Sequence, residues 1–206
     1  MKQMRYSSHF PLFQSHLDLA HTYWKQLIKP GDQAIDATCG NGQDTLVLCQ
    51  LILENPKSCV WAIDIQAKGI ELTRQHLSRH VEKPMLDRVY YQQGCHSQFP
   101  LEIHEESISL IIYNLGYLPG SDKNLTTQTA TTLQSLNRAL SLLKPGGAIS
   151  MTCYPGHAEG VKEESAILEF ANGLSPSKWS CCHHQWLNRK KSPGLLLIQK
   201  SITHHI

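Results

Sequence analysis

The sequence predicts an α/β fold with a mostly parallel β-sheet and helices on both of its faces. Two observations support this prediction. Short apolar segments alternate with segments of helical periodicity along most of the 206 residues, and glycine-containing turns follow several of the apolar segments. Strands alternating with helices are typical of βαβ units, which form parallel sheets with right-handed crossovers. We expect a single domain over residues 1–206, because a chain of this length can bury its own core.

The N-terminal half begins with a helix and continues with two strand–helix units. Apolar residues within 12–28 recur at helical spacing, with His16 on the same face, and Pro30 and Gly31 end this helix. Residues 1–30 are therefore predicted to form an N-terminal helical segment of the domain. The strands that follow are predicted at 33–38 and 58–64, and the helices at 44–53 and 67–80.

The remaining five strands are predicted after residue 87. Residues 107–115 are apolar through their middle, as expected for a strand buried on both faces. No helix separates the last two strands, so we expect one of them to run antiparallel in the edge region of a seven-stranded sheet. Strands are predicted at 88–93, 107–115, 147–154, 178–187 and 194–201, and helices at 125–143 and 161–174, with a turn at 144–147 after the first helix.

The composition is that of an ordinary globular protein. Hydrophobic residues make up 41% and charged residues 17%, which argues against a disordered chain. A net charge of +2 permits nucleic acid as a partner without requiring it. The seven cysteines form no CxxC motif, so we expect free thiols and a cytoplasmic location. We expect no membrane partner, because neither a signal peptide nor an apolar run of membrane-spanning length is visible.

A glycine turn follows the first predicted strand, in the stretch DATCGNGQDT. Gly40 and Gly42 lack a Cβ atom, so the backbone can bend and approach a ligand in the crevice beyond the strand ends. Asp64 ends the second strand, where an acid can accept hydrogen bonds from the ribose hydroxyls of a nucleoside. A dinucleotide fingerprint would need a third glycine where Thr45 stands. A plain strand-to-helix turn is the alternative interpretation.

These features resemble those of class I S-adenosylmethionine-dependent methyltransferases. That family has an acid and a glycine loop after its first strand, an acid ending its second strand, and often a PGG turn before its fifth. Residues 36–42, Asp64 and residues 144–147 occupy those places, with Thr38 where the loop usually has its first glycine. The resemblance implies a Rossmann-like class I methyltransferase fold, with S-adenosyl-L-methionine as the cofactor.

A narrower resemblance is carried by the blocks DATCGNGQDTLVL, AIDIQ, YNLGYLPGSDKNLTT and YPGHAEGVKEE. They are similar to small bacterial methyltransferases of the rRNA methylase family, from about residue 15 to the C-terminus. Members of that family are understood to convert 5-aminomethyluridine at the tRNA wobble position, often 2-thiolated, to 5-methylaminomethyluridine. The resemblance implies the same reaction here, with the anticodon stem-loop of tRNA as partner. Cys39 and Gln43 depart from the usual Met and His, which leaves the fine substrate geometry open.

The resemblance also implies a set of cofactor-binding residues near the strand ends. The free N–H groups of the helix after the glycine turn can bind an anionic group. His96 follows the third strand, near the place where this fold contacts adenine, although a surface histidine is the alternative. The residues expected to bind the cofactor are Asp36, Thr38, Gly40, Asn41, Gly42, Asp44, Thr45, Asp64, Ile65, Gln66, His96 and Asn114.

Asn114, at the end of the fourth strand, is the first catalytic candidate. Its side-chain carbonyl can accept a hydrogen bond from the substrate amine and turn the amine lone pair toward the methyl group, which is catalysis by positioning. Related amino-methyltransferases have Asn or Asp followed by Pro-Pro-Tyr at this place. Gly116 would let the substrate base approach, and Tyr117 would stack on it as aromatic residues do on splayed RNA bases. Packing of Tyr117 beneath its loop is the alternative.

Three further residues are candidates for handling the amine or the RNA. Asp122 would hold the cationic amine or take its proton, and Lys123 would contact phosphate, unless both are solvated loop charges. His157, after the fifth strand, would remove a proton near neutral pH, because the ordinary pKa of histidine is ~6.5. A loop-bracing hydrogen bond is the alternative role of His157.

Two short stretches near the C-terminus attract attention for their chemistry. Arg189 and Lys190, in the basic run NRKK, are expected to contact the anticodon stem backbone unless they are simply solvated. The stretch CCHH at 181–184 suggests a metal site. Neighbouring side chains on a strand point to opposite faces and do not easily converge on one ion, so we expect no metal.

Three functions remain open from the sequence. The first is a tRNA wobble-uridine N-methyltransferase, the second a methyltransferase acting on rRNA or a small molecule, and the third a non-catalytic nucleotide-binding module with the same fold. An enzyme is favoured because the chain has both a ribose-binding acid and a polar group at the end of the fourth strand. By analogy with other small RNA methyltransferases, a homodimer is also an expectation.

Overall fold

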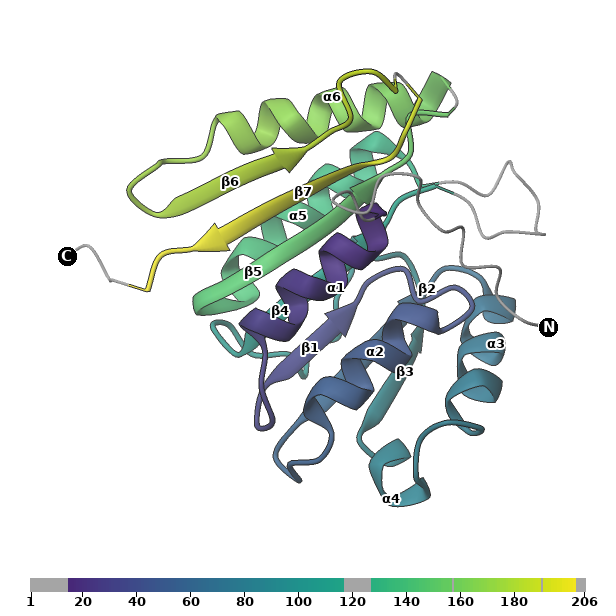
Figure 1. Ribbon diagram of the computed structural model, residues 1–206. Helices are drawn as coiled ribbons and strands as arrows, with labels where there is room; N and C mark the ends of the chain where they lie inside the picture. Colours follow the sequence, from purple (N-terminus) through teal and green to yellow (C-terminus); the bar gives the residue numbers. More distant parts are fainter. Residues whose placement is uncertain (1–14, 117–126, 157, 190, 203–206) are drawn as a thin grey trace.

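A single seven-stranded sheet organises the computed structural model, which describes residues 15–116, 127–156, 158–189 and 191–202 (Figure 1). The strand order is β3-β2-β1-β4-β5-β7-β6. The first five strands run parallel to one another. The strands are β1 Gln33–Asp36, β2 Cys59–Asp64, β3 Val89–Gln93, β4 Ile108–Asn114, β5 Leu143–Cys153, β6 Trp179–His184 and β7 Gly194–Lys200.

Helices cover both faces of this sheet, as the sequence predicts (Figure 1). Alternate residues of β4 point to opposite faces, so Leu110 and Ile112 pack with α1, α2 and α3, whereas Ile111 and Tyr113 pack with α5 and α6. All four side chains are buried, which explains the apolar run of this central strand. The helices are α1 His16–Leu27, α2 Gln43–Ile52, α3 Ala67–Leu77, α4 Lys83–Leu86, α5 Thr129–Leu142 and α6 Ala158–Asn172.

The C-terminal strands give the sheet its mixed character. β7 runs antiparallel to both β5 and β6, which confirms the expected antiparallel strand in the edge region. That strand lies one position in from the edge, because β7 pairs between β5 and β6. The edge strand β6 therefore runs parallel to the first five strands.

Some element boundaries differ from those predicted. The residues 144–147, predicted as a turn, lie inside β5, which starts at Leu143 with a register irregularity against β4. Gly146 has φ +80°, so this part of the strand bulges before regular pairing resumes at Ala148. The short helix α4, a single turn with a proline near its start, was not predicted. Among the described helices, none is both long enough and apolar enough to cross a membrane.

Candidate active site

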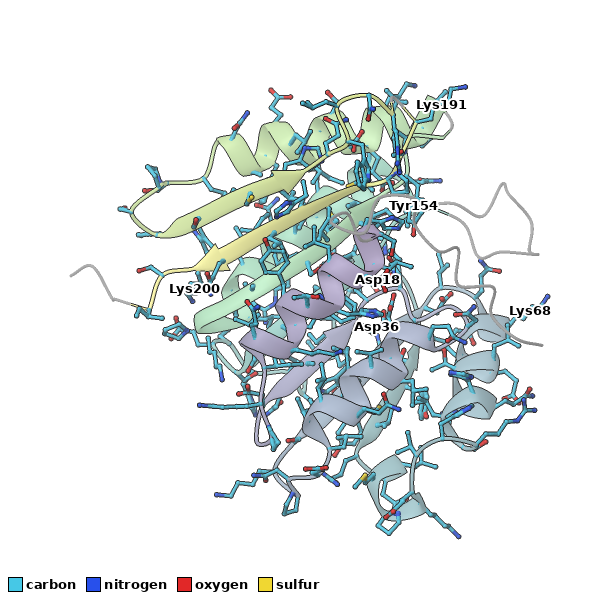
Figure 2. The ribbon with its side chains drawn as sticks, viewed as in Figure 1. Asp18, Asp36, Lys68, Tyr154, Lys191 and Lys200 are labelled. Carbon is cyan, nitrogen blue, oxygen red and sulfur yellow. The ribbon has the colours of Figure 1, made fainter. Side chains whose placement is uncertain are left out.

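The candidate site lies where the carboxyl ends of β1, β2 and β4 meet. β1 ends at Asp36, β2 at Asp64 and β4 at Asn114. The order of the strands reverses between β1 and β4, and ligands of open α/β sheets bind beyond the strand ends at such a point. Figure 2 labels Asp36 here, together with Tyr154, which follows β5 near the N-terminal end of α1.

The glycine turn between β1 and α2 is held tightly against α3. Gly42 has φ +79°, and a Cβ atom at this residue would lie only 2.9 Å from the Cα atom of Thr73. The Thr73 hydroxyl donates to the carbonyl oxygen of Gly40 over 3.2 Å. The sequence predicted that glycine lets a ligand approach this turn. The structure shows that Gly42 is also required for the turn to pack on α3.

The Asp64 carboxylate is held in one orientation and can still accept further hydrogen bonds. One carboxylate oxygen accepts from the N–H of Gly40 over 2.9 Å, and the other accepts from the N–H of Gln66 over 2.8 Å. Burial raises the pKa of Asp64, while these two backbone hydrogen bonds lower it. Because each carboxylate oxygen can accept a second hydrogen bond, the group can still bind two hydroxyls. Beside it, Ile65 exposes 60% of its surface, an apolar group next to the acid.

Gly69 is a site residue that the sequence analysis missed. A Cβ atom there would lie 2.6 Å from the carboxyl carbon of Asp64, so the acid occupies the space of the absent side chain. Glycine is unfavourable in the first turns of a helix, and Gly69 lies in the first turn of α3. This unfavourable position was the signal in the sequence that could have identified it.

Asp36 and Thr45 lie beneath the glycine turn rather than on its surface. Both are buried, and the Thr45 hydroxyl donates to a carboxylate oxygen of Asp36 over 2.7 Å. The other oxygen accepts from the N–H of Thr38 over 3.2 Å. Burial raises the pKa of Asp36 to about 7, and the nearby charges of Asp44 and Asp64 add to the rise. The pair braces the turn from inside; a direct cofactor contact by either residue stays a prediction.

Asn114 is fixed in one orientation by Asp44. The amide nitrogen Nδ2 of Asn114 donates a hydrogen bond to Oδ2 of Asp44. The other Asp44 oxygen, Oδ1, is hydrogen-bonded to Nε2 of His21 over 2.7 Å. An ionised carboxylate only accepts hydrogen bonds, so the NH₂ group of Asn114 must face Asp44. The backbone N–H of Asn114 donates to the Thr38 hydroxyl over 2.7 Å. The chain thus fixes both the amide and the backbone of this residue.

This orientation leaves the side-chain oxygen of Asn114 without a hydrogen-bond donor among the described residues. Oδ1 of Asn114 is buried and has no hydrogen-bond partner among the described residues. A buried polar atom left without a partner costs about 1–3 kcal/mol. A ligand N–H placed against Oδ1 would recover this free energy, so the site is prepared for a donor at this point.

Helix α1 contributes two histidines that the sequence analysis did not assign to the site. His21 bonds with Asp44, and Nε2 of His16 lies 3.2 Å from the hydroxyl oxygen of Tyr154. Burial lowers the pKa of His16, although the charges of Asp44 and Asp18 oppose this. Burial also raises the pKa of Tyr154 to about 12, with Asp44 adding to the rise. A histidine on the apolar face of the predicted helix was the available signal.

His96 is buried, so the alternative of a surface histidine is wrong. It is 8% exposed, its Nε2 lies 3.4 Å from the Thr132 hydroxyl oxygen, and its ring meets the Tyr113 ring edge-on. Burial lowers its pKa to about 4, so His96 is neutral at neutral pH. The ring nitrogens of a buried histidine need hydrogen-bond partners, and Thr132 supplies one. Its contact with adenine stays a prediction.

The remaining predicted residues divide into those described and those not. Asn41 is exposed on the turn, Gly116 has φ +133°, and the guanidinium of Arg189 lies 4.3 Å from the centre of the Trp186 ring. The other predicted residues lie outside the described part of the chain, namely Tyr117, Asp122, Lys123, His157 and Lys190.

The cysteines and histidines of β6 do not gather around one point. All seven cysteines are free. His184 lies 3.5 Å from Cys182 and 3.0 Å from the Tyr23 hydroxyl, whereas His183 faces Glu164 at 3.8 Å. Within the described ranges, no group of three or more His, Cys, Asp or Glu side chains is arranged to hold a metal ion.

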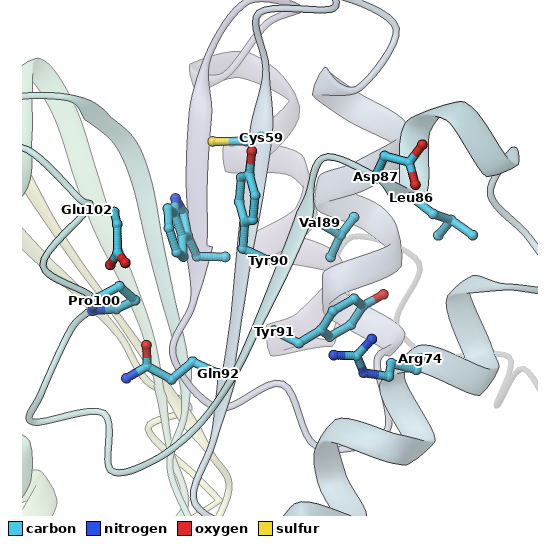
Figure 3. A pocket seen from close by; sticks show the side chains of 11 residues that line it. Cys59, Arg74, Leu86, Asp87, Val89, Tyr90, Tyr91, Gln92, Pro100 and Glu102 are labelled. Carbon is cyan, nitrogen blue, oxygen red and sulfur yellow. The ribbon is translucent and has the colours of Figure 1, made fainter.

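A groove at the edge of the sheet lies away from these residues. An open groove of about 740 Å³ lies along the edge strand β3, with Tyr90 and Tyr91 in its lining (Figure 3). The Trp61 ring packs against the Tyr90 ring, and the guanidinium of Arg74 stacks on the Tyr91 ring. None of the acids at the strand ends lines it. The groove is therefore separate from the candidate site.

Comparison with known proteins connects this geometry to a family. The family described as "Putative rRNA methylase" matches residues 60–200. A chloroplastic tRNA (mnm(5)s(2)U34)-methyltransferase of Arabidopsis thaliana is 40% identical over 187 residues, which is 89% of this chain and 68% of the relative. The chain belongs to the rRNA methylase family.

Solved structures of related proteins support the assignment to the rRNA methylase family. A structure from Clostridium thermocellum, titled a putative rRNA-methylase, is 33% identical with a TM-score of 0.84, covering 91% of this chain and 98% of that one. A methyltransferase from Streptococcus mutans in complex with SAH is 31% identical with a TM-score of 0.78, covering 91% and 99%. The predicted class I methyltransferase fold is confirmed.

The buried acid Asp36 predicts a pH dependence of stability in this rRNA methylase family member. Its pKa of about 7 in the folded protein lies above the ordinary value of 3.8, so the protonated acid favours folding. That contribution is complete below about pH 4 and is lost as the pH rises through about 7. Between pH 5 and pH 8, the unfolding free energy of the parent should fall relative to Asp36→Asn by at least about 1 kcal/mol.

Urea unfolding of both proteins across this pH range tests the prediction. Asn at 36 can accept from the Thr38 N–H and donate to the Thr45 hydroxyl, so the brace persists without the charge. The matched control is Asp87→Asn on an exposed acid, whose profile should follow the parent. Parallel profiles for the parent and Asp36→Asn would show that Asp36 does not titrate in this range.

Proposed function

We propose that this protein is an S-adenosyl-L-methionine-dependent N-methyltransferase that converts 5-aminomethyl-(2-thio)uridine at the tRNA wobble position to 5-methylaminomethyl-(2-thio)uridine. The observation that carries the proposal is the buried Oδ1 of Asn114, which is oriented by Asp44 and has no described partner. An amine is a substrate with the N–H donor that this atom lacks. The similarity to a plant tRNA (mnm(5)s(2)U34)-methyltransferase supports tRNA as the carrier of that amine.

The residues at the strand ends fit an adenosyl cofactor. Asp64 keeps acceptor capacity for two ribose hydroxyls, and the exposed apolar side chain of Ile65 offers a surface for a base. When bound, S-adenosyl-L-methionine supplies a methyl group activated by a positively charged sulfur. The carboxylates of Asp44 and Asp64 contribute negative charge near that region, which favours a cationic ligand.

The task of the protein in such a reaction is mainly positioning. An amine attacks only as the free base, with its lone pair aimed at the methyl carbon. Asn114 accepts one N–H of the amine at Oδ1, and this hydrogen bond turns the lone pair toward the methyl group. Asp44 keeps the amide from rotating, since rotation would place a carboxylate against the amide oxygen. Well-oriented reactants can account for several powers of ten in rate, so a fixed amide is a direct contribution to catalysis.

Methyl transfer to tRNA tests the proposal directly. The purified protein is incubated with methyl-labelled S-adenosyl-L-methionine and bulk tRNA from cells that lack the wobble modification. We expect label in 5-methylaminomethyl nucleosides after digestion and mass analysis. Label confined to rRNA or to a small metabolite would replace tRNA as the substrate, and tight cofactor binding without any transfer would indicate a binding module instead.

Replacement of Asp64 tests the cofactor site. Asp64→Ala should weaken binding of S-adenosyl-L-methionine at least tenfold, because a lost charged hydrogen bond of about 1.5–3 kcal/mol corresponds to that factor. Isothermal titration calorimetry measures the affinity. Glu71→Ala, which removes an exposed acid from the following helix α3, should bind as the parent does. Unchanged affinity in Asp64→Ala would place the ribose elsewhere.

Replacement of Asn114 tests the chemical step. Asn114→Ala should slow single-turnover methyl transfer by about 10- to 100-fold, the range given by one hydrogen bond of about 1.5–3 kcal/mol. Although Asn114 is also expected beside the cofactor, cofactor affinity should stay within about twofold of the parent, because the hydrogen bond that the substitution removes is assigned to the amine. A comparison with Asp44→Asn separates contact from orientation, because an amide at 44 allows Asn114 to turn and should also slow the step. A parental rate in Asn114→Ala would remove this residue from the mechanism.

A further inference from the structure

Two sequence blocks distant from one another meet beside the site. The block YNLGYLPGSDKNLTT ends at Thr127, at the start of the segment leading into α5, and the block YPGHAEGVKEE runs into α6. Helices α5 and α6 pack side by side on the same face of the sheet (Figure 1). Thr127 of the first block bonds to Glu163 of the second, and two threonines of α5, Thr129 and Thr132, also bond to glutamates of α6.

Gly116 and Thr127 form a hydrogen-bonded pair next to Asn114. The N–H of Gly116 donates to the Thr127 hydroxyl oxygen over 3.0 Å, and the N–H of Thr127 donates to the carbonyl oxygen of Gly116 over 3.0 Å. Gly116 needs this support, because its φ of +133° is a conformation open to glycine alone among ordinary residues. Among the described residues, a Cβ atom there would meet nothing nearer than a ring carbon of Tyr154 at 3.9 Å.

Glu163 determines which way the Thr127 hydroxyl points. The hydroxyl donates to Oε2 of Glu163 over 2.7 Å. Thr127 has one hydroxyl proton, and because the carboxylate takes it, a lone pair of the oxygen is left to face the N–H of Gly116. Glu163 is only 2% exposed, so the surrounding residues restrict its side chain and keep the carboxylate beside the Thr127 hydroxyl.

The carboxylate of Glu163 also accepts a second hydrogen bond, from another threonine. Its other oxygen, Oε1, accepts from the Thr132 hydroxyl over 2.6 Å, and the Thr132 oxygen lies 3.4 Å from Nε2 of His96. One turn earlier on α6, Glu159 accepts from the Thr129 hydroxyl over 3.0 Å. These contacts join α5 to α6, but none of them reaches Gly116.

We propose that Glu163, acting through Thr127, is a positioning residue that fixes the backbone of Gly116 for the approach of the substrate base. The chain leaves β4 at Asn114, and the Leu115 N–H still bonds to the Thr152 carbonyl oxygen of β5. Gly116 is therefore the first residue past the sheet, and its backbone N–H and carbonyl oxygen both bond to Thr127. The inference rests on the proposed function, since it concerns the entry of the tRNA base to that site.

Two valine substitutions separate positioning from stability. Thr127→Val and Thr132→Val each remove one hydroxyl from Glu163 while keeping the shape of the side chain. Only the first removes the acceptor of the Gly116 N–H. Thr127→Ser retains the hydroxyl and should behave as the parent.

The first readout is the rate of amide hydrogen exchange, which is measured by NMR in the absence of substrate. In Thr127→Val, exchange at the Gly116 N–H should accelerate at least tenfold, whereas in Thr132→Val it should stay within about twofold of the parent. Equal exchange rates in the two valine variants would overturn the proposal, because the Thr127 hydroxyl would then give the Gly116 N–H no protection from exchange.

The second readout is methyl transfer at tRNA concentrations below saturation. The value of kcat/KM for tRNA should fall about tenfold in Thr127→Val with unchanged affinity for S-adenosyl-L-methionine, and Thr132→Val should be close to the parent. Equal losses in both variants would indicate a purely structural role and overturn the proposal. If the parent itself does not methylate tRNA, the proposed function fails, while the exchange measurement still decides whether Thr127 holds Gly116. In that case exchange in Glu163→Gln, compared with the parent, decides the part of Glu163.

Discussion

The arrangement of the site depends on how Asp44 shares its two carboxylate oxygens. One oxygen binds His21 of α1 and the other binds Asn114 at the end of β4, so a single side chain of α2 connects three elements. An acceptor-only group between two donors permits one orientation of each. The N-terminal helix is thereby part of the site, and the free acceptor of Asn114 follows from the same constraint.

Negative charge is concentrated at these strand ends, and the protein manages its cost in different ways. Asp64 is stabilised by two backbone N–H groups, Asp44 by a histidine and an amide, and Asp36 by the protonation that its raised pKa favours. Three neighbouring carboxylates would repel one another if all were ionised and unpaired. A cationic sulfonium or ammonium ligand would relieve that repulsion, which links the charge distribution to the class of ligand.

The sequence predicts those features that depend on local pattern. Period and apolar runs identify all seven strands, and the glycines near Asp36 together with Asp64 mark the end of the sheet to which the cofactor is assigned in the proposal. Contacts between distant segments have no local signature. The pairing of His21 with Asp44, the burial of His96 against Thr132, and the position of β7 between β5 and β6 are all set by the packing of elements that the sequence does not place in space. The irregular start of β5 escapes prediction for a related reason, because Pro and Gly normally indicate a turn.

The absence of a side chain at Gly69 shows how binding and folding compete at one position. Alanine would favour an isolated helix by about 1 kcal/mol over glycine, yet here its methyl group would occupy the volume of the Asp64 carboxyl group. Helix α3 therefore carries a weak point in its opening turn for the sake of an acid on the neighbouring strand. Efforts to make this enzyme more heat-resistant by strengthening its helices should leave that residue alone, because a methyl group there would displace the Asp64 carboxyl group.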